Sequence, residues 1–148
     1  MIRPVEKSDE SVYIALAKEF YSSDAVLHNI DEKYICRAFR EITRPSPYAE
    51  GFLFFDGDEV AGYGLIAKTF SQEHGGPLVW IDEVYVRAPY RGKGLGKEFF
   101  EYIFERYKDS AFRLETEKDN ERARKLYGQL GFEELGYLQM VRKNKSNF

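Results

Sequence analysis

Apolar and polar positions alternate with two different periods along the first part of the chain. Residues 2–5 predict a short strand. Apolar residues then recur at helical spacing in two segments, the first capped by Ser8 or Asp9 and the second beginning near Asp31. Prolines within residues 44–47 end the second segment, so two helices are expected after the first strand.

The middle of the chain has the shorter period of strands. Residues 51–55 form an apolar run, and Asp56-Gly57 directly after it is a strong hairpin signal. A third strand is expected over residues 60–69. A polar loop at residues 71–77 then leads into the apolar run 78–86, which predicts a central strand.

Helix and strand periods alternate again towards the end of the sequence. A helix is expected to end near Tyr107, a strand to cover residues 112–117, and a helix to run from a cap at Asn120 to about Gly131. Residues 132–142 predict a terminal pair of strands. The resulting order, β-α-α-β-β-β-α-β-α-β-β, indicates a mixed α/β sheet with helices on both faces.

Composition narrows the class of protein. A chain of 148 residues suits a single domain over residues 1–148, and 43% hydrophobic with 32% charged residues indicates a globular protein. A net charge of −3 argues against a general nucleic-acid binder. The chain has no signal-peptide pattern and no apolar run of spanning length, so we expect a cytoplasmic protein with no membrane partner. Cys36 is the single cysteine and is expected to be a small buried residue.

The most informative segment is Arg91-Gly92-Lys93-Gly94-Leu95-Gly96, between the apolar run and a helical pattern. Glycines let the backbone approach a phosphate closely, and the N–H groups and dipole of a helix N-terminus favour negative charge. Arg91, Lys93 and Lys97 add cations. The segment therefore predicts a site for a phosphate-bearing cofactor.

Other glycine loops fit less well. A P-loop needs Ser or Thr after Gly-Lys, but Gly94 follows Lys93 here. A dinucleotide fingerprint that starts at Gly92 needs a sixth-position glycine, where Lys97 stands. A tight connection between a strand and a helix, with no ligand, is the remaining alternative.

Three separated segments resemble the GNAT superfamily of acyl-CoA-dependent N-acyltransferases. Arg91, Gly94 and Gly96 match its Gln/Arg-x-x-Gly-x-Gly/Ala signature. Residues 84–92 resemble the family's approach to that loop, and residues 120–132 resemble its second cofactor segment. The start of the chain is also similar, and the order of elements agrees over nearly its whole length.

The resemblance implies a GNAT-like, mostly antiparallel sheet of about six to seven strands with about four helices, and acetyl-CoA as cosubstrate. The loop would hold the pyrophosphate, the preceding strand would pair with the pantetheine arm, and Tyr127 would lie near the thioester sulfur as general acid. The cofactor-binding residues implied, besides Tyr127, are Val84, Tyr85, Val86, Arg91, Gly92, Lys93, Gly94, Leu95, Gly96, Lys97 and Asn120.

Carboxylates in the central strand are the other chemical signal. Asp82 and Glu83 interrupt an apolar run, and burying an unpaired carboxylate is costly, so at least one should open onto a cleft or meet a cation. An amine with a pKa of about 10.4 is mostly protonated at neutral pH and needs a base. Glu83 is the first candidate, Glu115 the second and Asp82 the third. Tyr127 lies seven residues after Asn120 and shares its helix face, but a tyrosine that only packs there is the alternative.

The acceptor is less well defined. Several acids in the expected acceptor-side segments slightly favour a small cationic amine over a protein N-terminus, but an ordinary solvated acidic surface fits them as well. The polar residues in question are His28, Asp31, Glu32, Glu73 and His74. No metal site is expected, and the protein is expected to be a monomer or homodimer. The alternatives to an acetyltransferase are a non-catalytic acyl-CoA-binding module on the same fold and a plain α/β interaction domain.

Overall fold

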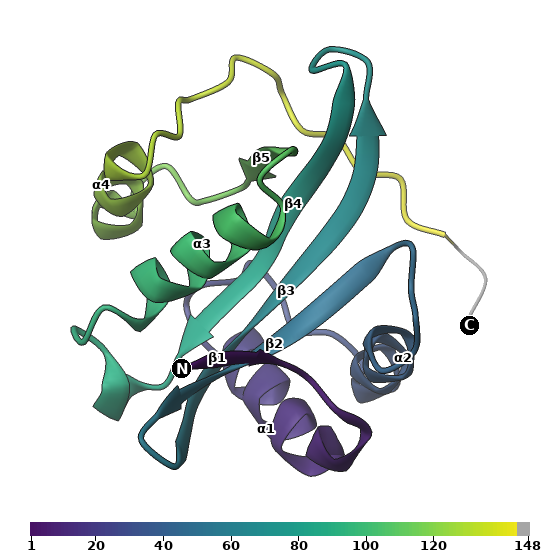
Figure 1. The fold of residues 1–148 in the computed structure, drawn as a ribbon, viewed down its shortest axis with the longest axis vertical. Helices are drawn as coiled ribbons and strands as arrows, with labels where there is room; N and C mark the ends of the chain where they lie inside the picture. Colours follow the sequence, from purple (N-terminus) through teal and green to yellow (C-terminus); the bar gives the residue numbers. More distant parts are fainter. Residues whose placement is uncertain (145–148) are drawn as a thin grey trace. The chain divides into compact units, whose positions relative to one another are not determined.

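A five-stranded sheet in the spatial order β1-β2-β3-β4-β5 organises the first part of the chain (Figure 1). All neighbouring strands are antiparallel except β4 and β5, which are parallel. The strands are β1 (Ile2–Pro4), β2 (Ala49–Asp56), β3 (Glu59–Ser71), β4 (Gly76–Val86) and β5 (Ala111–Leu114). Gly57 forms the predicted turn between β2 and β3 with a φ of +60°, a left-handed conformation that glycine adopts at no steric cost.

The computed structural model describes residues 1–144, which fall into two units, Met1–Glu117 and a second unit that begins at Lys118. Residues 1–144 contain four α-helices: α1 (Glu10–Tyr21), α2 (Glu32–Ile42), α3 (Leu95–Arg106) and α4 (Glu121–Gln129). Two short 3-10 helices, η1 (Lys7–Asp9) and η2 (Ala88–Tyr90), precede α1 and follow β4. The predicted mixed α/β fold is confirmed.

Helices α1 and α2 cover one face of the sheet. Leu16 of α1 and Phe39 of α2 join Leu53 and Tyr63 of the sheet in one buried cluster. The second helix begins next to Asp31 as predicted, and the Asp31 side chain caps it by accepting a hydrogen bond from the Lys33 N–H over 3.0 Å. Asp9 does not cap α1 with its side chain; its carboxylate instead accepts hydrogen bonds from Arg3 and from the Glu6 N–H.

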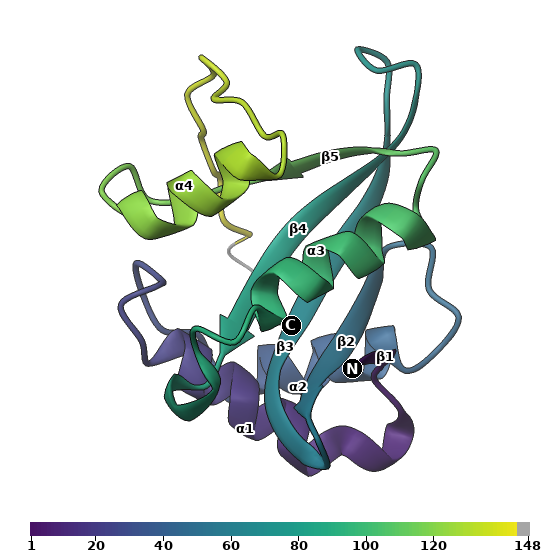
Figure 2. The same cartoon turned by 60° about the vertical axis from the view of Figure 1, so that its left-hand side comes forward.

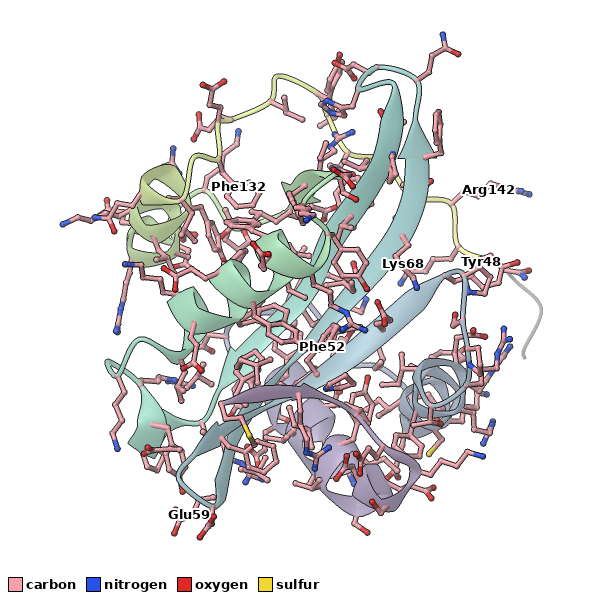
Figure 3. All side chains as sticks on the ribbon, in the orientation of Figure 1. Tyr48, Phe52, Glu59, Lys68, Phe132 and Arg142 are labelled. Carbon is pink, nitrogen blue, oxygen red and sulfur yellow. The ribbon has the colours of Figure 1, made fainter. Side chains whose placement is uncertain are left out.

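Helix α3 lies across the opposite face (Figure 2). Its Phe99 ring lies 5.9 Å from Phe52 and 4.9 Å from Phe54 of β2, centroid to centroid, and Phe52 is seen on β2 near this helix in Figure 3. Gly64 of β3 makes this packing close, because a Cβ there would lie 2.4 Å from Cζ of Phe99. The aromatic residues of the sequence therefore form much of the core of this layer.

The second unit contains α4, and the Asn120 side chain caps it as predicted by accepting from the Ala123 N–H over 3.2 Å. The terminal pair of strands expected over residues 132–142 is a wrong prediction, since no strand forms between α4 and residue 144. The sheet accordingly has five strands in the described residues and not six to seven. Leu138 and Met140 have the spacing of a strand but are exposed in the structure. The spacing predicted a strand without showing which strand it would pair with.

Candidate functional site

The glycine loop joins β4 to α3 through two left-handed glycines. Gly92 has a φ of +78° and Gly94 a φ of +81°, and Gly94 is the residue that precedes α3. The first intrahelical hydrogen bond runs from the Glu98 N–H to the Gly94 carbonyl, over 2.9 Å. The N–H groups at positions 95–97 precede it and have no partner within the helix, and such groups at a helix N-terminus are suited to bind an anion.

The space in front of this loop is open. A Cβ placed on Gly92, Gly94 or Gly96 would meet no atom of the described residues within 4 Å. Only the two left-handed positions need glycine for their backbone conformation. Gly96 lies inside the helix and has no positive φ, so its backbone conformation does not require glycine, and the missing side chain leaves the backbone accessible.

The predicted cations of the loop differ in what they contact. The Nε of Arg91 donates to the Val86 carbonyl over 2.8 Å, which ties the loop back to the end of β4. Lys93 pairs with Asp56 at 2.7 Å, and Lys97 pairs with Glu101 at 3.8 Å. Both lysines are more than half exposed, so these pairs are weak and open to exchange with a ligand anion.

The turn between β2 and β3 borders the same loop. Besides the pair between Asp56 and Lys93, the Tyr90 hydroxyl donates a hydrogen bond to Glu59. Glu59 is labelled at the tip of this hairpin in Figure 3. Two acids of the hairpin thus hold the loop in place from the side.

The outer edge of β4 is unpaired beyond its midpoint. Pairing with β5 ends at Ile81 opposite Leu114, whereas pairing with β3 continues to Val86. The Arg87 N–H donates to the Ala61 carbonyl, and hydrogen-bonded residues alternate along an antiparallel pair. The N–H and carbonyl groups of Val84 and Val86 therefore point away from β3, towards an edge with no strand partner in Met1–Glu117.

A bulge in β4 determines the orientation of the acids. Ile81 lies opposite Ile66 and Glu83 lies opposite Leu65, so Asp82 is an extra residue that faces no partner on β3. Side chains of consecutive residues on β3 point to opposite faces. Glu83 therefore points to the face covered by α1 and α2, and Ile81 points to the other face.

Two tyrosine hydroxyls donate to the Glu83 carboxylate. Tyr21 of α1 donates to Oε2 over 2.5 Å, and Tyr63 of β3 donates to Oε1. Burial raises the pKa of the Glu83 carboxyl, the two phenol hydrogen bonds lower it, and Asp82 raises it further, with a net shift upwards. The pKa of Glu83 is therefore higher than that of a free carboxyl but lower than it would be without the two hydrogen bonds.

Glu83 lines a pocket of about 100 Å³ between α1, α2 and β3. Tyrosine and aliphatic side chains make up the rest of its wall. The lining residues beside Glu83 are Tyr13, Ala17, Tyr21, Ile30, Tyr34, Ile35, Ala38 and Leu65. The predicted cleft at the central strand is therefore present at Glu83.

The other two candidate bases lie elsewhere. Asp82 is exposed, but desolvation by the surrounding atoms and repulsion from Glu115 raise the pKa of its carboxyl. Glu115 directly follows β5 and is exposed. Neither residue lines the pocket.

An ion pair between Arg87 and Glu19 was not predicted from the sequence. The Arg87 guanidinium donates to Glu19 of α1 through Nε and Nη2, the latter over 2.9 Å, and through Nη1 to the Val60 carbonyl. The Tyr85 hydroxyl donates to Glu19 over 3.2 Å. These contacts join α1 to the end of β4, where the glycine loop begins, but 68 residues separate the pair and leave no spacing signal.

The second unit holds the remaining predicted residues. Tyr127 lies on α4, half-buried, with its ring 6.1 Å from that of Phe132 in an edge-on contact. Burial raises the pKa of its phenol. The side-chain oxygen of Asn120 caps the same helix. The side-chain NH₂ group of Asn120 is therefore the group that would contact a ligand.

Sequence comparison identifies the family of this fold. A family model described as "Acetyltransferase (GNAT) family" matches residues 11–132. The chain belongs to the GNAT acetyltransferase family. No helix among residues 1–144 combines the length and apolar character needed to cross a membrane.

Two curated relatives and one solved structure illustrate the similarity. The chain is 33% identical to the spermine/spermidine N(1)-acetyltransferase of Bacillus subtilis over 92 residues, which are 58% of this chain and 60% of that protein. It is 34% identical to the thialysine N-epsilon-acetyltransferase of Bos taurus over 82 residues, 53% of this chain and 48% of that protein. The matches thus span about half to three fifths of these relatives.

An integron cassette protein from the mobile metagenome of Cole Harbour Salt Marsh has the same fold. It superposes with a TM-score of 0.79 at 26% identity, covering 99% of this chain and 91% of that one. The GNAT fold expected from the glycine signature is confirmed by this similarity.

Proposed function

We propose that the protein transfers an acetyl group from acetyl-CoA to the primary amine of a small cationic acceptor. The proposal rests on one observation: two sets of unpaired backbone groups follow each other directly along the chain. The open edge of β4 at Val84 and Val86 leads through the glycine loop to the N-terminus of α3. A ligand with an extended amide chain and a diphosphate matches this combination.

Each part of acetyl-CoA has a fitting group in the chain. The N–H groups at positions 95–97 would hold the pyrophosphate, with Lys93 and Lys97 exchanging their carboxylate partners for phosphate. The outward groups of Val84 and Val86 would pair with the pantetheine amides as an added strand does. Open space at Gly96 admits the phosphate to the backbone.

The acceptor amine needs a base before it can react. At neutral pH about one alkylamine in a thousand is unprotonated, given a pKa of about 10.4. Glu83 is the proposed base, since its carboxyl has a raised pKa and lines a pocket in which an amine would be held. Glu115 and Asp82 are the alternatives, and their place outside the pocket lining favours Glu83.

The proposed reaction is a direct transfer with no acyl-enzyme. Glu83 takes a proton from the ammonium, directly or through water, and the amine lone pair forms a C–N bond to the thioester carbonyl. A strand backbone N–H near Val86 polarises that carbonyl oxygen. The C–S bond then breaks, and the leaving thiolate takes a proton from the Tyr127 hydroxyl. The second proton that the nitrogen loses as it becomes an amide restores the phenol. Burial favours the protonated phenol, which this role requires.

The class of acceptor is supported by the relatives. Their names specify spermine, spermidine and thialysine, which are small amines with cationic groups. The pocket at Glu83 contributes a single negative charge among aromatic and aliphatic walls. A protein N-terminus is the competing acceptor.

An acetyl-CoA turnover assay with a panel of acceptors tests the proposal. Free thiol release would be followed with linear diamines, amino acids, aminoglycosides and peptides. Turnover with small cationic amines is expected, and turnover with peptides alone would reject this acceptor class. Protection from thermal unfolding by CoA with no turnover would instead indicate a non-catalytic acyl-CoA-binding module.

A further inference from the structure

The pocket at Glu83 has one charged lining residue. No other acidic residue and no lysine or arginine lines it in the part of the chain that the structure describes. Each carboxylate oxygen accepts one tyrosine hydroxyl, from Tyr21 or Tyr63, and each retains further acceptor capacity. The pocket therefore favours a ligand with one positive charge that donates hydrogen bonds.

Tyr13 provides a second polar group for such a ligand. It lines the pocket, and its side chain is only 1% exposed. Its ring is held by Phe39 and Tyr63, with centroids at 5.7 and 5.5 Å. Because Tyr13 lines the pocket, a ligand N–H group in the pocket could donate a hydrogen bond to this hydroxyl oxygen.

The aromatic walls also suit a cation. Tyr34 of α2 and Tyr21 of α1 line the pocket together with Tyr13. The faces of tyrosine rings attract ammonium groups, and the attraction is stronger where water is excluded. Three rings and one carboxylate thus give both the charge preference and the desolvation that an ammonium site needs.

The size of the pocket limits what can enter. About 100 Å³ is well below the roughly 300–1,000 Å³ typical of sites for drug-sized ligands. Ala17 and Ala38 are the smallest lining residues, one from each helix, and aliphatic side chains complete the wall. The space suits an unbranched chain end and is too small for a sugar ring or a branched side chain.

The geometry points to this pocket as the site for the ammonium end of an unbranched primary alkylamine. Glu83 and Tyr13 hold the ammonium, and Ala17 and Ala38 determine which chains fit. This inference rests on the proposed acetyltransferase function, and it adds the shape of the acceptor and the residues that select it.

Filling the pocket tests the inference. Ala38→Leu adds bulk from α2, and it should raise the KM for n-butylamine about tenfold while leaving the KM for acetyl-CoA unchanged. Ala25→Leu is the matched control, because Ala25 is exposed and does not line the pocket. Tyr13→Phe removes only the hydroxyl and should raise the same KM severalfold. In the parent protein, n-butylamine should be used far better than tert-butylamine.

The outcomes separate this inference from the proposed function. Turnover of n-butylamine with an unchanged KM in both Ala38→Leu and Tyr13→Phe overturns the pocket assignment and leaves the acetyltransferase function intact. If no amine is turned over, calorimetric binding of n-butylamine decides. Binding that Ala38→Leu abolishes and Ala25→Leu preserves supports the pocket while the proposed function fails, and absence of binding overturns the assignment.

Discussion

Tyr63 on β3 donates its hydroxyl hydrogen to Oε1 of Glu83 on the neighbouring strand. Burial raises the pKa of that carboxyl, and this hydrogen bond with its counterpart from Tyr21 opposes the rise. The two tyrosines therefore favour the ionised carboxylate, the form in which Glu83 accepts a proton. The hydroxyls of the sheet and of α1 thus set the protonation of the proposed base.

Removing one of these hydroxyls should change the pH dependence of the reaction. Tyr63→Phe deletes a hydrogen bond that lowers the pKa of Glu83, so the acidic limb of kcat/KM should move to higher pH. Profiles of kcat/KM between pH 5 and 9 measure the change. Tyr48→Phe, at a position 66% exposed, is the control and should leave the limb in place. An unmoved limb in Tyr63→Phe contradicts the role of Glu83 as base.

The same carboxyl should influence stability. Because its pKa is higher in the folded than in the unfolded protein, its contribution to stability is fully present below the unfolded value. That contribution is lost as the pH rises through the folded value. Glu83→Gln does not titrate, so the parent protein should lose more thermal stability than this variant between pH 4 and 8. Parallel Tm curves for the two proteins would exclude a raised pKa.

Tyr127 should act on turnover more than on binding. Tyr127→Phe removes the proposed proton donor for the thiolate and should lower kcat about a hundredfold, with the KM for acetyl-CoA nearly unchanged. Tyr137→Phe is the matched control in the same unit, since Tyr137 is 65% exposed. Steady-state kinetics of both variants suffice, and an unchanged kcat in Tyr127→Phe removes this residue from the chemistry.

Gly96 should matter for the ligand and not for the fold. A Cβ at this position meets nothing within 4 Å and the φ is not left-handed, so Gly96→Ala should fold with an unchanged or higher Tm. The methyl group would occupy the proposed approach of the pyrophosphate, and the KM for acetyl-CoA should rise about tenfold or more. Gly76→Ala, equally open at the start of β4, should change neither value. A normal KM in Gly96→Ala would show that no ligand approaches there.

Gly64 should matter for the fold alone. An added Cβ would lie 2.4 Å from Phe99 of α3, so Gly64→Ala should destabilise the protein by about 1–3 kcal/mol through overpacking. A chain of this size should lose about 2–4 °C in Tm for each kcal/mol. Phe99→Leu in the same protein should recover part of the loss by making space, which calorimetry can measure. Additive losses in the double variant would contradict a direct clash.

Local signals in the sequence predicted much of the fold. Asp31 and Asn120 are helix caps, Gly57 is a hairpin turn and Gly94 precedes α3, and each of these depends on residues within a few positions. The terminal strands were predicted wrongly because a strand needs a partner edge that no local pattern specifies.

The surroundings of the candidate base were not predicted. Tyr21 is 62 residues and Tyr63 is 20 residues from Glu83 along the chain, so neither contact has a spacing signal. Only the conflict between two acids and an apolar strand pointed to this place. The place of Tyr13 in the pocket wall is likewise a consequence of how α1 packs on the sheet.

Asp82 has a consequence beyond its own side chain. In a strand without a bulge, residues 81 and 83 are two positions apart and would point to the same face of the sheet. The extra residue makes them point to opposite faces, so that Glu83 meets the two tyrosines on one face while Ile81 lies on the other. The direction of the proposed base therefore depends on the number of residues in one strand as well as on which residues the strand contains.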